Sequence, residues 1–383
     1  MDITKRNFLK IAQTLREGFA SRADEADKAG KLPVEDIQAL KESGYLTVSV
    51  DKAFGGLGLP MKDCLAAQLE LAQGSASTAI VAAMPVHIFG SAGEGNPWFD
   101  EAYEMLCSAV VNEGALINSV ASEPALGSPS RGGLPESNAV PTPDGAGWIV
   151  NGLKTWTTGG RHITHMLVRL RIEDDAAVML VRQDMPGVEW IENWGDSLSL
   201  RASDSHDVRF TDVVVPADHL LHRGASKRPN QPNAWFPMMM SSVYLGAALA
   251  SRDAVIKFAL ERVPTSLGRP ISTLPKIQRQ IGEIDLALQA AKALLFEVAE
   301  AWQDDDAIRQ KVYPRVVAAK YQIIEAAAFV TDQALRVAGG SSITKELTLE
   351  RHFRDVRAGS MQPPSGDTAL EIIGRNAIAQ IEG

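Results

Sequence analysis

The 383-residue sequence is poor in cysteine, and its two cysteines, Cys64 and Cys107, are too few to build a disulfide framework. It also lacks an uninterrupted apolar run near the roughly 18 residues that a membrane span requires. Charged side chains at Lys5, Arg6 and Arg16 break up the region where a secretory signal needs an apolar stretch. We therefore expect a protein of the reducing cytoplasm that has no membrane partner.

A basic tract is absent as well. Lysines and arginines total 38 against 47 aspartates and glutamates, which gives a formal net charge of −9. Because nucleic-acid binding depends on clustered positive charge, we expect no nucleic-acid partner. The hydrophobic content of 45% and charged content of 22% are typical of soluble globular proteins, and the length predicts roughly two or three domains.

Hydrophobic spacing divides the chain into three parts. Residues 1–118 have apolar side chains at helical spacing, and residues 119–230 have short β-rich runs punctuated by glycine and proline. In residues 231–383 the helical period returns, with a heptad-like stripe from Ile277 to Trp302 that is typical of one helix of a bundle. The predicted fold class is α+β and multidomain: an N-terminal all-α domain, a central antiparallel β domain and a C-terminal helical bundle.

Two motifs have the composition of a ligand site. In the loop 122–128, Ser122 and Ser128 supply hydroxyl groups and Gly127 permits close backbone approach, as a flat polar ring or a phosphate requires. An ordinary turn has the same composition.

The second motif is segment 151–160, in which the Trp156 indole can pack on an aromatic cofactor. The hydroxyls of Thr157 and Thr158 can then meet the polar edge of that cofactor. A β-turn with a core tryptophan is the alternative.

Two further motifs are less specific when taken alone. Segment 198–205 leads into a strand at 210–216, which is typical of plain structural sheet. Gly339 and Gly340 are typical of a helix end, and the charged segment 350–355 is typical of a surface ion pair.

Together and in this order, the four motifs resemble those of the acyl-CoA dehydrogenase superfamily of flavoproteins, over essentially the full chain. That family has a Thr-Glu-Pro-x-x-Gly-Ser loop, then Gly-x-Lys-x-Trp-x-Thr, then Arg-x-Ser before a Phe-x-Asp-Val-x-Val-Pro strand, and finally Gly-Gly followed by Arg-x-x-Arg-Asp. The matching residues here are Ser122, Glu123, Pro124, Gly127 and Ser128, then Gly152, Lys154, Trp156 and Thr158, then Arg201, Ser203, Phe210, Asp212, Val213, Val215 and Pro216, and finally Gly339, Gly340, Arg351, Arg354 and Asp355.

The resemblance implies that the C-terminal part is a four-helix bundle and that FAD lies between this bundle and the β domain. It implies that Ser122 and Ser128 line the flavin and the substrate. It also implies that Trp156 flanks the isoalloxazine ring and that Thr158 bonds the edge of that ring.

The resemblance also implies a homotetramer or homodimer in which a neighbouring subunit completes the FAD site. Gly339 and Gly340 would approach the adenosine half, and Arg262 is the nearest candidate for the arginine that meets the pyrophosphate. Here the sequence departs from the family, because the usual glutamine before the glycines is Arg336 and the Arg-x-x-Phe-Gly signature is stretched after Arg262.

A larger departure concerns the catalytic base. The family's glutamate lies in a Tyr-Glu-Gly-Thr segment after Arg-Asp, and Pro363 stands in its place here. The family's second base position, on the first bundle helix, falls near Phe236. A base contributes roughly a hundredfold to ten-thousandfold in rate, so the loss matters. Asp367 and Glu371, one or two helical turns further along, are candidate replacements; solvated surface acids are the alternative.

These departures resemble a branch of the superfamily that contains flavin monooxygenases and hydroxylases, which need no α-proton base. Such sites must exclude water while reduced flavin meets oxygen. His87, within an apolar helical stretch, is the candidate catalytic residue for that chemistry, and a satisfied core histidine is the alternative.

No metal site is predicted, because the close histidine pairs at 162 and 165 and at 219 and 222 lack a third ligand nearby. The primary interpretation is an acyl-CoA dehydrogenase that acts on a CoA thioester and passes electrons to an electron-transfer flavoprotein. The alternatives are a two-component flavin monooxygenase supplied by a flavin reductase, and a flavin-bound regulatory protein without catalysis.

Overall fold

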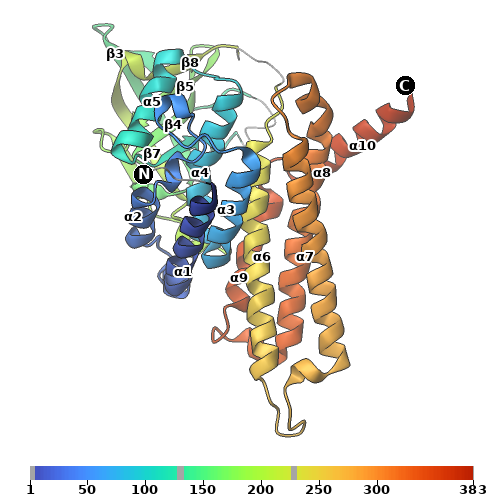
Figure 1. The fold of residues 1–383 in the computed structure, drawn as a ribbon. Coiled ribbons are helices and arrows are strands. Elements are labelled where there is room, and N and C mark those ends of the chain that lie inside the picture. The colour runs from blue at the N-terminus through green and yellow to red at the C-terminus, as the bar shows by residue number, and fades with distance from the viewer. Residues whose placement is uncertain (1–4, 127–132, 226–230, 383) are drawn as a thin grey trace.

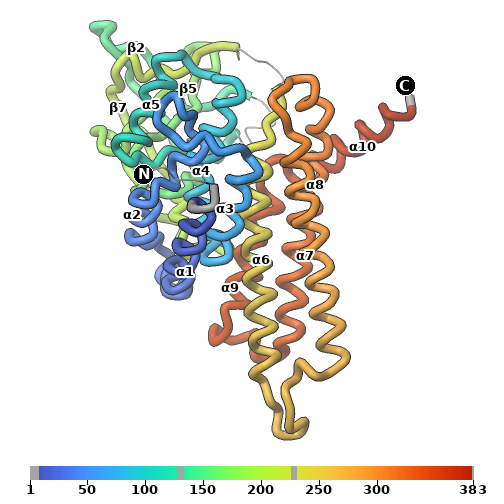
Figure 2. The backbone as a smooth tube through the Cα atoms, in the orientation of Figure 1, coloured from blue at the N-terminus to red at the C-terminus, as the bar shows by residue number. Residues whose placement is uncertain are grey.

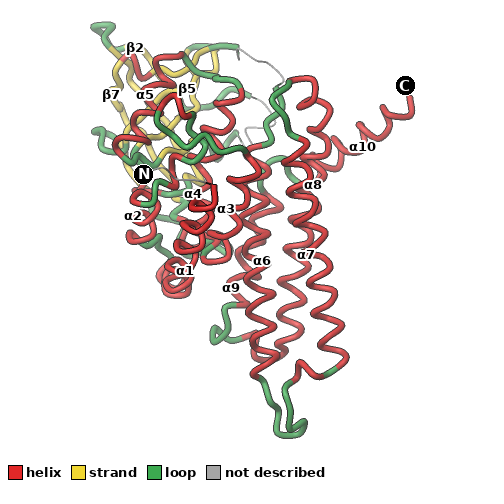
Figure 3. Tube along the Cα trace, viewed as in Figure 1, coloured by secondary structure: helices red, strands yellow, loops and turns green. Residues whose placement is uncertain are grey.

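The structure is a computed structural model that describes residues 5–126, 133–225 and 231–382. Helices at the N-terminal end, a sheet in the middle and long helices at the C-terminal end follow one another along the chain (Figures 1 and 3). The predicted fold class is confirmed. The predicted boundaries at 118 and 230 stay predictions.

The N-terminal part consists of five α-helices that pack beside the sheet and the long helices: α1 (Lys5–Ala29), α2 (Val34–Glu42), α3 (Met61–Gly74), α4 (Ala76–Glu94) and α5 (Asp100–Glu113). Among the described helices, α4 alone is long and apolar enough to cross a membrane, which the search for uninterrupted apolar runs did not predict. Because 89% of that apolar window is buried inside the fold, we interpret α4 as a core helix.

The central part is one sheet whose eight described strands follow the order β6-β7-β3-β2-β4-β5-β8, with β1 paired to β4. The strands are β1 (Ile117–Val120), β2 (Asn138–Pro141), β3 (Gly147–Thr157), β4 (His165–Ile172), β5 (Asp175–Arg182), β6 (Val188–Ile191), β7 (His206–Pro216) and β8 (Leu220–Arg223). The sheet is mixed, because β1 and β2 both pair with β4 in parallel. This corrects the prediction of a wholly antiparallel domain. The long connection between β1 and β4 removes the tight turn that would impose an antiparallel pair.

The C-terminal part contains α6 (Trp235–Glu261), α7 (Pro275–Ala301), α8 (Asp306–Ala338), α9 (Leu349–Asp355) and α10 (Gly366–Glu382). Three of them, α6, α7 and α8, lie side by side along their length (Figures 1 and 2). The predicted apolar stripe of α7 is buried apart from Ile281, which is half-buried. The fourth long segment, α10, starts against α8 and then extends away from the other helices.

The helix α9 joins all three parts. Arg354 donates to both carboxylate oxygens of Asp27 on α1, at 3.1 and 2.6 Å, and to Glu350. The next residue, Asp355, accepts from the backbone N–H of Leu200, at 2.9 Å. Burial raises the pKa of Asp355 to about 6. The Arg-Asp motif therefore acts as a buried structural joint, not as a solvated surface pair.

The contact between α3 and α6 depends on Gly246, because a β-carbon there would lie 2.9 Å from the Leu69 carbonyl oxygen and against Ala72. We expect Gly246→Ala to destabilise the fold by about 1–3 kcal/mol, since overpacking forces the two helices apart. Urea unfolding measures the change. Gly282→Ala on α7 is the matched control, because no atom lies near that position, and it should be neutral or stabilising. Equal effects of the two variants would contradict this account.

Candidate functional site

A buried ion pair connects the first two motifs. The Lys154 ammonium donates to Glu123 Oε1, at 2.6 Å, and to the Arg169 carbonyl. Glu123 also accepts from the backbone N–H groups of Glu136 and Ser137, at 2.7 and 3.1 Å. Burial alone would raise the pKa of Glu123, but these hydrogen bonds outweigh it and hold the pKa below its usual value. The pair fixes the end of the Ser122 loop against strand β3.

Hydroxyl groups from the second and third motifs meet at the end of β3. Thr158 Oγ1 lies 2.9 Å from Ser205 Oγ, which lies 2.7 Å from Ser203 Oγ. The Thr158 carbonyl accepts from the Asn118 amide, and the half-buried Ser122 accepts through its carbonyl from the Thr155 N–H. The structure thus brings together three motifs that are well separated in sequence.

Trp156 and Thr157 have properties that are compatible with binding of a flat ligand. Trp156 has a left-handed backbone (φ 57°) and its side chain is 62% exposed, so the alternative of a core tryptophan is wrong. The neighbouring Thr157 is buried, and its hydroxyl has no hydrogen-bond partner. An exposed indole beside an unsatisfied buried hydroxyl fits a planar cofactor with a polar edge. The predicted residues Gly127 and Ser128 lie outside the described residues.

The predicted residues for the adenosine half lie elsewhere. Arg262 directly follows α6, and Gly339 and Gly340 directly follow α8; all three are exposed. Since α7 runs back between them, α6 and α8 end at the same end of the bundle, away from the sheet (Figure 1). Within one chain, the structure does not bring these residues to Trp156.

His87 lies on α4 and is buried. Its ring meets the ring of Phe236 edge to face, with centroids 5.0 Å apart and planes at 85°. Burial lowers the pKa of His87 to about 3, so the imidazole is neutral at physiological pH. The structure therefore places a neutral imidazole against Phe236, the residue near which the resemblance puts the family's second base position.

The first base position, at Pro363, lies between α9 and α10, next to a residue that contacts α6. The side-chain amide of Gln362, the residue before Pro363, donates to the Tyr244 hydroxyl at 3.5 Å. Phe236, Met240 and Tyr244 are spaced by four residues on α6, so Phe236, which contacts His87, and Tyr244, which contacts Gln362, lie about 12 Å apart along one side of that helix. No carboxylate is present at either position.

Asp367 and Glu371 do not join this group. Both are exposed on α10, and no described hydrogen bond or ring contact connects either acid to His87, Phe236 or Gln362. Sequence reasoning placed the two acids correctly on a helix after Pro363, but it missed Gln362, Tyr244 and the buried Lys320. The available signal for the last was a lysine on the apolar stripe of α8, between Val316 and Ile324.

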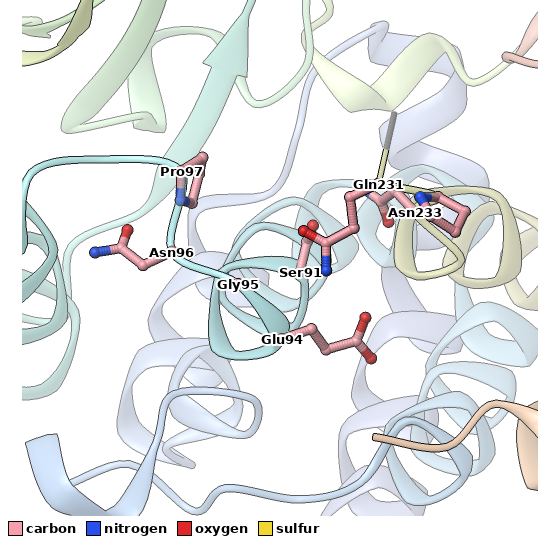
Figure 4. Close-up of a pocket in the computed structure, with 8 residues that line it drawn as sticks. Ser91, Glu94, Gly95, Asn96, Pro97, Gln231 and Asn233 are labelled. Carbon is pink, nitrogen blue, oxygen red and sulfur yellow. The ribbon is translucent and has the colours of Figure 1, made fainter. Parts of the chain in front are cut away.

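A separate small cleft lies where α4 ends and α6 begins (Figure 4). It measures about 170 Å³, and its lining is mainly polar: Ser91, Glu94, Gly95, Asn96, Pro97, Gln231, Pro232 and Asn233. Ligand pockets are typically about 300–1,000 Å³, so the cleft is too small for a flavin ring system. It contains none of the predicted site residues. Nearby, Glu94 accepts from the indole N–H groups of Trp235 and Trp302, at 2.8 Å each, which ties α4 to α6 and to the end of α7.

Within the described residues, no group of three or more histidine, cysteine, aspartate or glutamate side chains could hold a metal ion. The nearest approach is Asp204 between His162 and His206, at 3.8 and 3.9 Å.

The sequence matches the family models for the acyl-CoA dehydrogenase N-terminal domain over residues 9–95, the middle domain over 119–213 and the C-terminal domain over 238–362. It is 36% identical to the putative acyl-CoA dehydrogenase YdbM of Bacillus subtilis, over 97% of each chain. The chain therefore belongs to the acyl-CoA dehydrogenase family, whose members are flavin-dependent oxidoreductases.

Other relatives have different activities. The chain is 29% identical to the L-evernosamine nitrososynthase of a Micromonospora strain, over 94% of this chain and 87% of the relative. The solved structure of KijD3 in complex with dTDP has a TM-score of 0.84, at 26% identity over 98% of this chain and 97% of that one. TdsC from Paenibacillus sp. A11-2, solved with FMN and indole, shares the fold, with a TM-score of 0.84 at 23% identity over 96% of each chain.

The buried Glu123–Lys154 pair generates a stability prediction. Lys154→Met should destabilise the fold by about 3–5 kcal/mol, because it leaves the Glu123 charge buried without its partner. Guanidinium unfolding measures the change, and Glu123→Gln/Lys154→Met is the control that removes both charges and should recover part of the loss. A double variant no more stable than Lys154→Met would contradict the pairing.

The same pair gives an expected pH dependence. The pKa of Glu123 is lower in the folded protein than in the unfolded chain. The contribution of Glu123 to the free energy of unfolding is therefore fully present above the unfolded-state pKa. It is lost as the pH falls through the folded-state pKa. In Glu123→Gln, the free energy of unfolding should accordingly fall less steeply with decreasing pH than in the wild type. Identical dependences on pH would contradict the lowered pKa of Glu123.

Proposed function

We propose that this protein is a flavin-dependent monooxygenase that uses reduced flavin and O₂ to oxidise a small molecule. The proposal rests on the two family base positions, which the resemblance places at Pro363 and near Phe236. Neither residue is a carboxylate, and Phe236 lies against the neutral His87 ring. An acyl-CoA dehydrogenase needs a base at the α-carbon, whereas oxygen chemistry at a flavin needs a pocket that excludes water.

The chain's own residues then have distinct roles. Trp156 offers its exposed indole face to the flavin ring, and the unpaired Thr157 hydroxyl and the Thr158 cluster meet its polar edge. Bound flavin supplies the electrons that activate oxygen. The neutral His87 ring has one N–H donor and one acceptor nitrogen, and it stays uncharged at neutral pH beside the Phe236 ring.

Assembly and cofactor form part of the same proposal. Because Arg262, Gly339 and Gly340 lie at the far end of the bundle, a neighbouring subunit of a homodimer or homotetramer would bring them to the flavin, and their presence favours FAD. FMN is the alternative, since TdsC was solved with FMN. The electron donor would be a flavin reductase, and the location the cytoplasm.

Dehydrogenation of an acyl-CoA, with an electron-transfer flavoprotein as acceptor, is the second candidate. The similarity to YdbM, which is named a putative acyl-CoA dehydrogenase, favours it. It would require Asp367 or Glu371 to act as base, and both are exposed on α10. A flavin-bound regulatory role without catalysis remains the alternative if the flavin never exchanges electrons.

The monooxygenase proposal can be tested without knowing the substrate. Reduced flavin in this site should consume O₂ but release H₂O₂ at least about tenfold more slowly than free reduced flavin, because the pocket excludes water. His87→Phe should speed the release, since the phenyl ring removes both ring nitrogens and with them the hydrogen bond that His87 is proposed to make. His222→Asn, on strand β8, is the control and should match the wild type. Simultaneous O₂ uptake and H₂O₂ release in the wild-type protein would refute the proposal.

The flavin contact is tested separately. Trp156→Ala should weaken flavin binding about tenfold, or roughly 1.4 kcal/mol, because the ring loses its exposed aromatic partner. Quenching of flavin fluorescence gives the dissociation constants for FAD and FMN. Phe99→Ala removes another partly exposed aromatic side chain and should leave both constants unchanged. Unchanged affinity in Trp156→Ala would remove Trp156 from the site.

A further inference from the structure

A buried lysine lies directly beneath the segment that lacks the family's glutamate. Lys320 on α8 is 2% exposed, and its ammonium donates to the carbonyl oxygens of Gly359, Gln362 and Pro364, at 3.1, 2.9 and 3.0 Å. An ammonium has three protons and no acceptor. Three carbonyls of one turn therefore satisfy all its donors, which compensates the cost of burying the charge.

The same turn packs tightly against α6 and α8. A β-carbon on Gly359 would lie 2.8 Å from Ile324 Cδ1 and 3.0 Å from Tyr244 Cδ2, so the backbone contacts these side chains directly. Three residues on, the Gln362 amide reaches the Tyr244 hydroxyl. The lysine thus fixes the backbone of Gln362, whose side chain contacts Tyr244. Tyr244 is at one end of the row that Phe236, Met240 and Tyr244 form on α6.

We propose that Lys320 is a positioning residue: it holds the 359–364 turn so that Gln362 presents a neutral amide at the Tyr244 end of the substrate site, opposite His87. The assignment of this side of α6 to the substrate rests on the proposed function. Because every ammonium proton is already donated to the turn, Lys320 acts through Gln362 and does not itself touch the substrate. The Gln362 amide oxygen has no partner among the described residues, and it can accept a hydrogen bond from a substrate N–H or O–H group.

Hydrogen exchange measured by mass spectrometry on the full chain tests the positioning role without flavin or substrate. In Lys320→Met, the amides of residues 356–362 should exchange at least about tenfold faster than in the wild type. Exchange in α7 should stay the same. Lys311→Met is the matched control, because Lys311 is an exposed lysine on the same helix, and it should change neither region. Unchanged exchange in the turn, or faster exchange in α7 by the same factor, would overturn the proposal.

Gly359→Ala tests the same connection while the charge stays in place. Its methyl group should displace the turn from Ile324 and Tyr244 and raise the exchange of the same amides. If Lys320 acts through the turn, the double variant should exchange little faster than the faster single variant, because the two changes act on one contact. Multiplicative effects would contradict the proposal. This variant also keeps the test valid if Lys320→Met does not fold.

A second measurement separates positioning from a purely structural role. In the flavin-loaded protein, Lys320→Met should speed H₂O₂ release severalfold while flavin affinity stays within about twofold of the wild type. If flavin affinity falls by the same factor by which H₂O₂ release becomes faster, the variant has loosened the fold in general, and the positioning role is overturned. If the wild type itself releases H₂O₂ immediately, the proposed function fails, and the exchange measurements still decide whether Lys320 holds the turn.

Discussion

The buried ion pair between Glu123 and Lys154 is the interaction on which the candidate site depends. Removing two charges from water is expensive, and here the cost is offset by a short contact between the charges, two backbone N–H groups on the carboxylate and a backbone carbonyl on the ammonium. Each of these hydrogen bonds is directional, so together they restrict the positions of both side chains. The pair consequently holds the Ser122 loop and the end of strand β3 in one arrangement, with the strained Trp156 presented outward.

A second constraint is the way in which α6 organises the other end of the site. One side of this helix has Phe236 against the His87 ring and Tyr244 against the Gln362 amide. The resemblance places the family's base positions at Pro363, next to Gln362, and near Phe236, and neither of these residues is a carboxylate. The chain thus retains the family fold, and in the proposed function hydrogen bonding in an apolar pocket takes the place of proton removal.

Much of the architecture follows from sequence periodicity, because the change from helical to alternating spacing and back marks the three parts. The parallel pairing of β1 with β4 does not follow, since it depends on which strands meet across a long connection. The same holds for the site. Trp156 and Thr158 were predicted from composition, and the base position at Pro363 was predicted from the family resemblance, by its place after Arg354-Asp355. The contact between His87 and Phe236 joins residues on two distant helices, and no local pattern encodes it.

Asp367 and Glu371 were predicted to lie on a helix, and they do. Because α10 extends away from the bundle, both acids are exposed there, and whether either acts as a base stays a prediction. Lys320 could have been noticed as a charge on an apolar stripe. Its hydrogen-bond partners could not be predicted, because they are backbone carbonyl groups, which every residue has.

The most direct test of the central claim is an anaerobic titration of the flavin-loaded protein with acyl-CoA thioesters of graded chain length, following the visible absorbance of the oxidised flavin. Since neither base position holds a carboxylate, we expect the flavin to stay oxidised with every thioester. Bleaching by any of them within seconds would contradict the account and would identify the protein as a dehydrogenase.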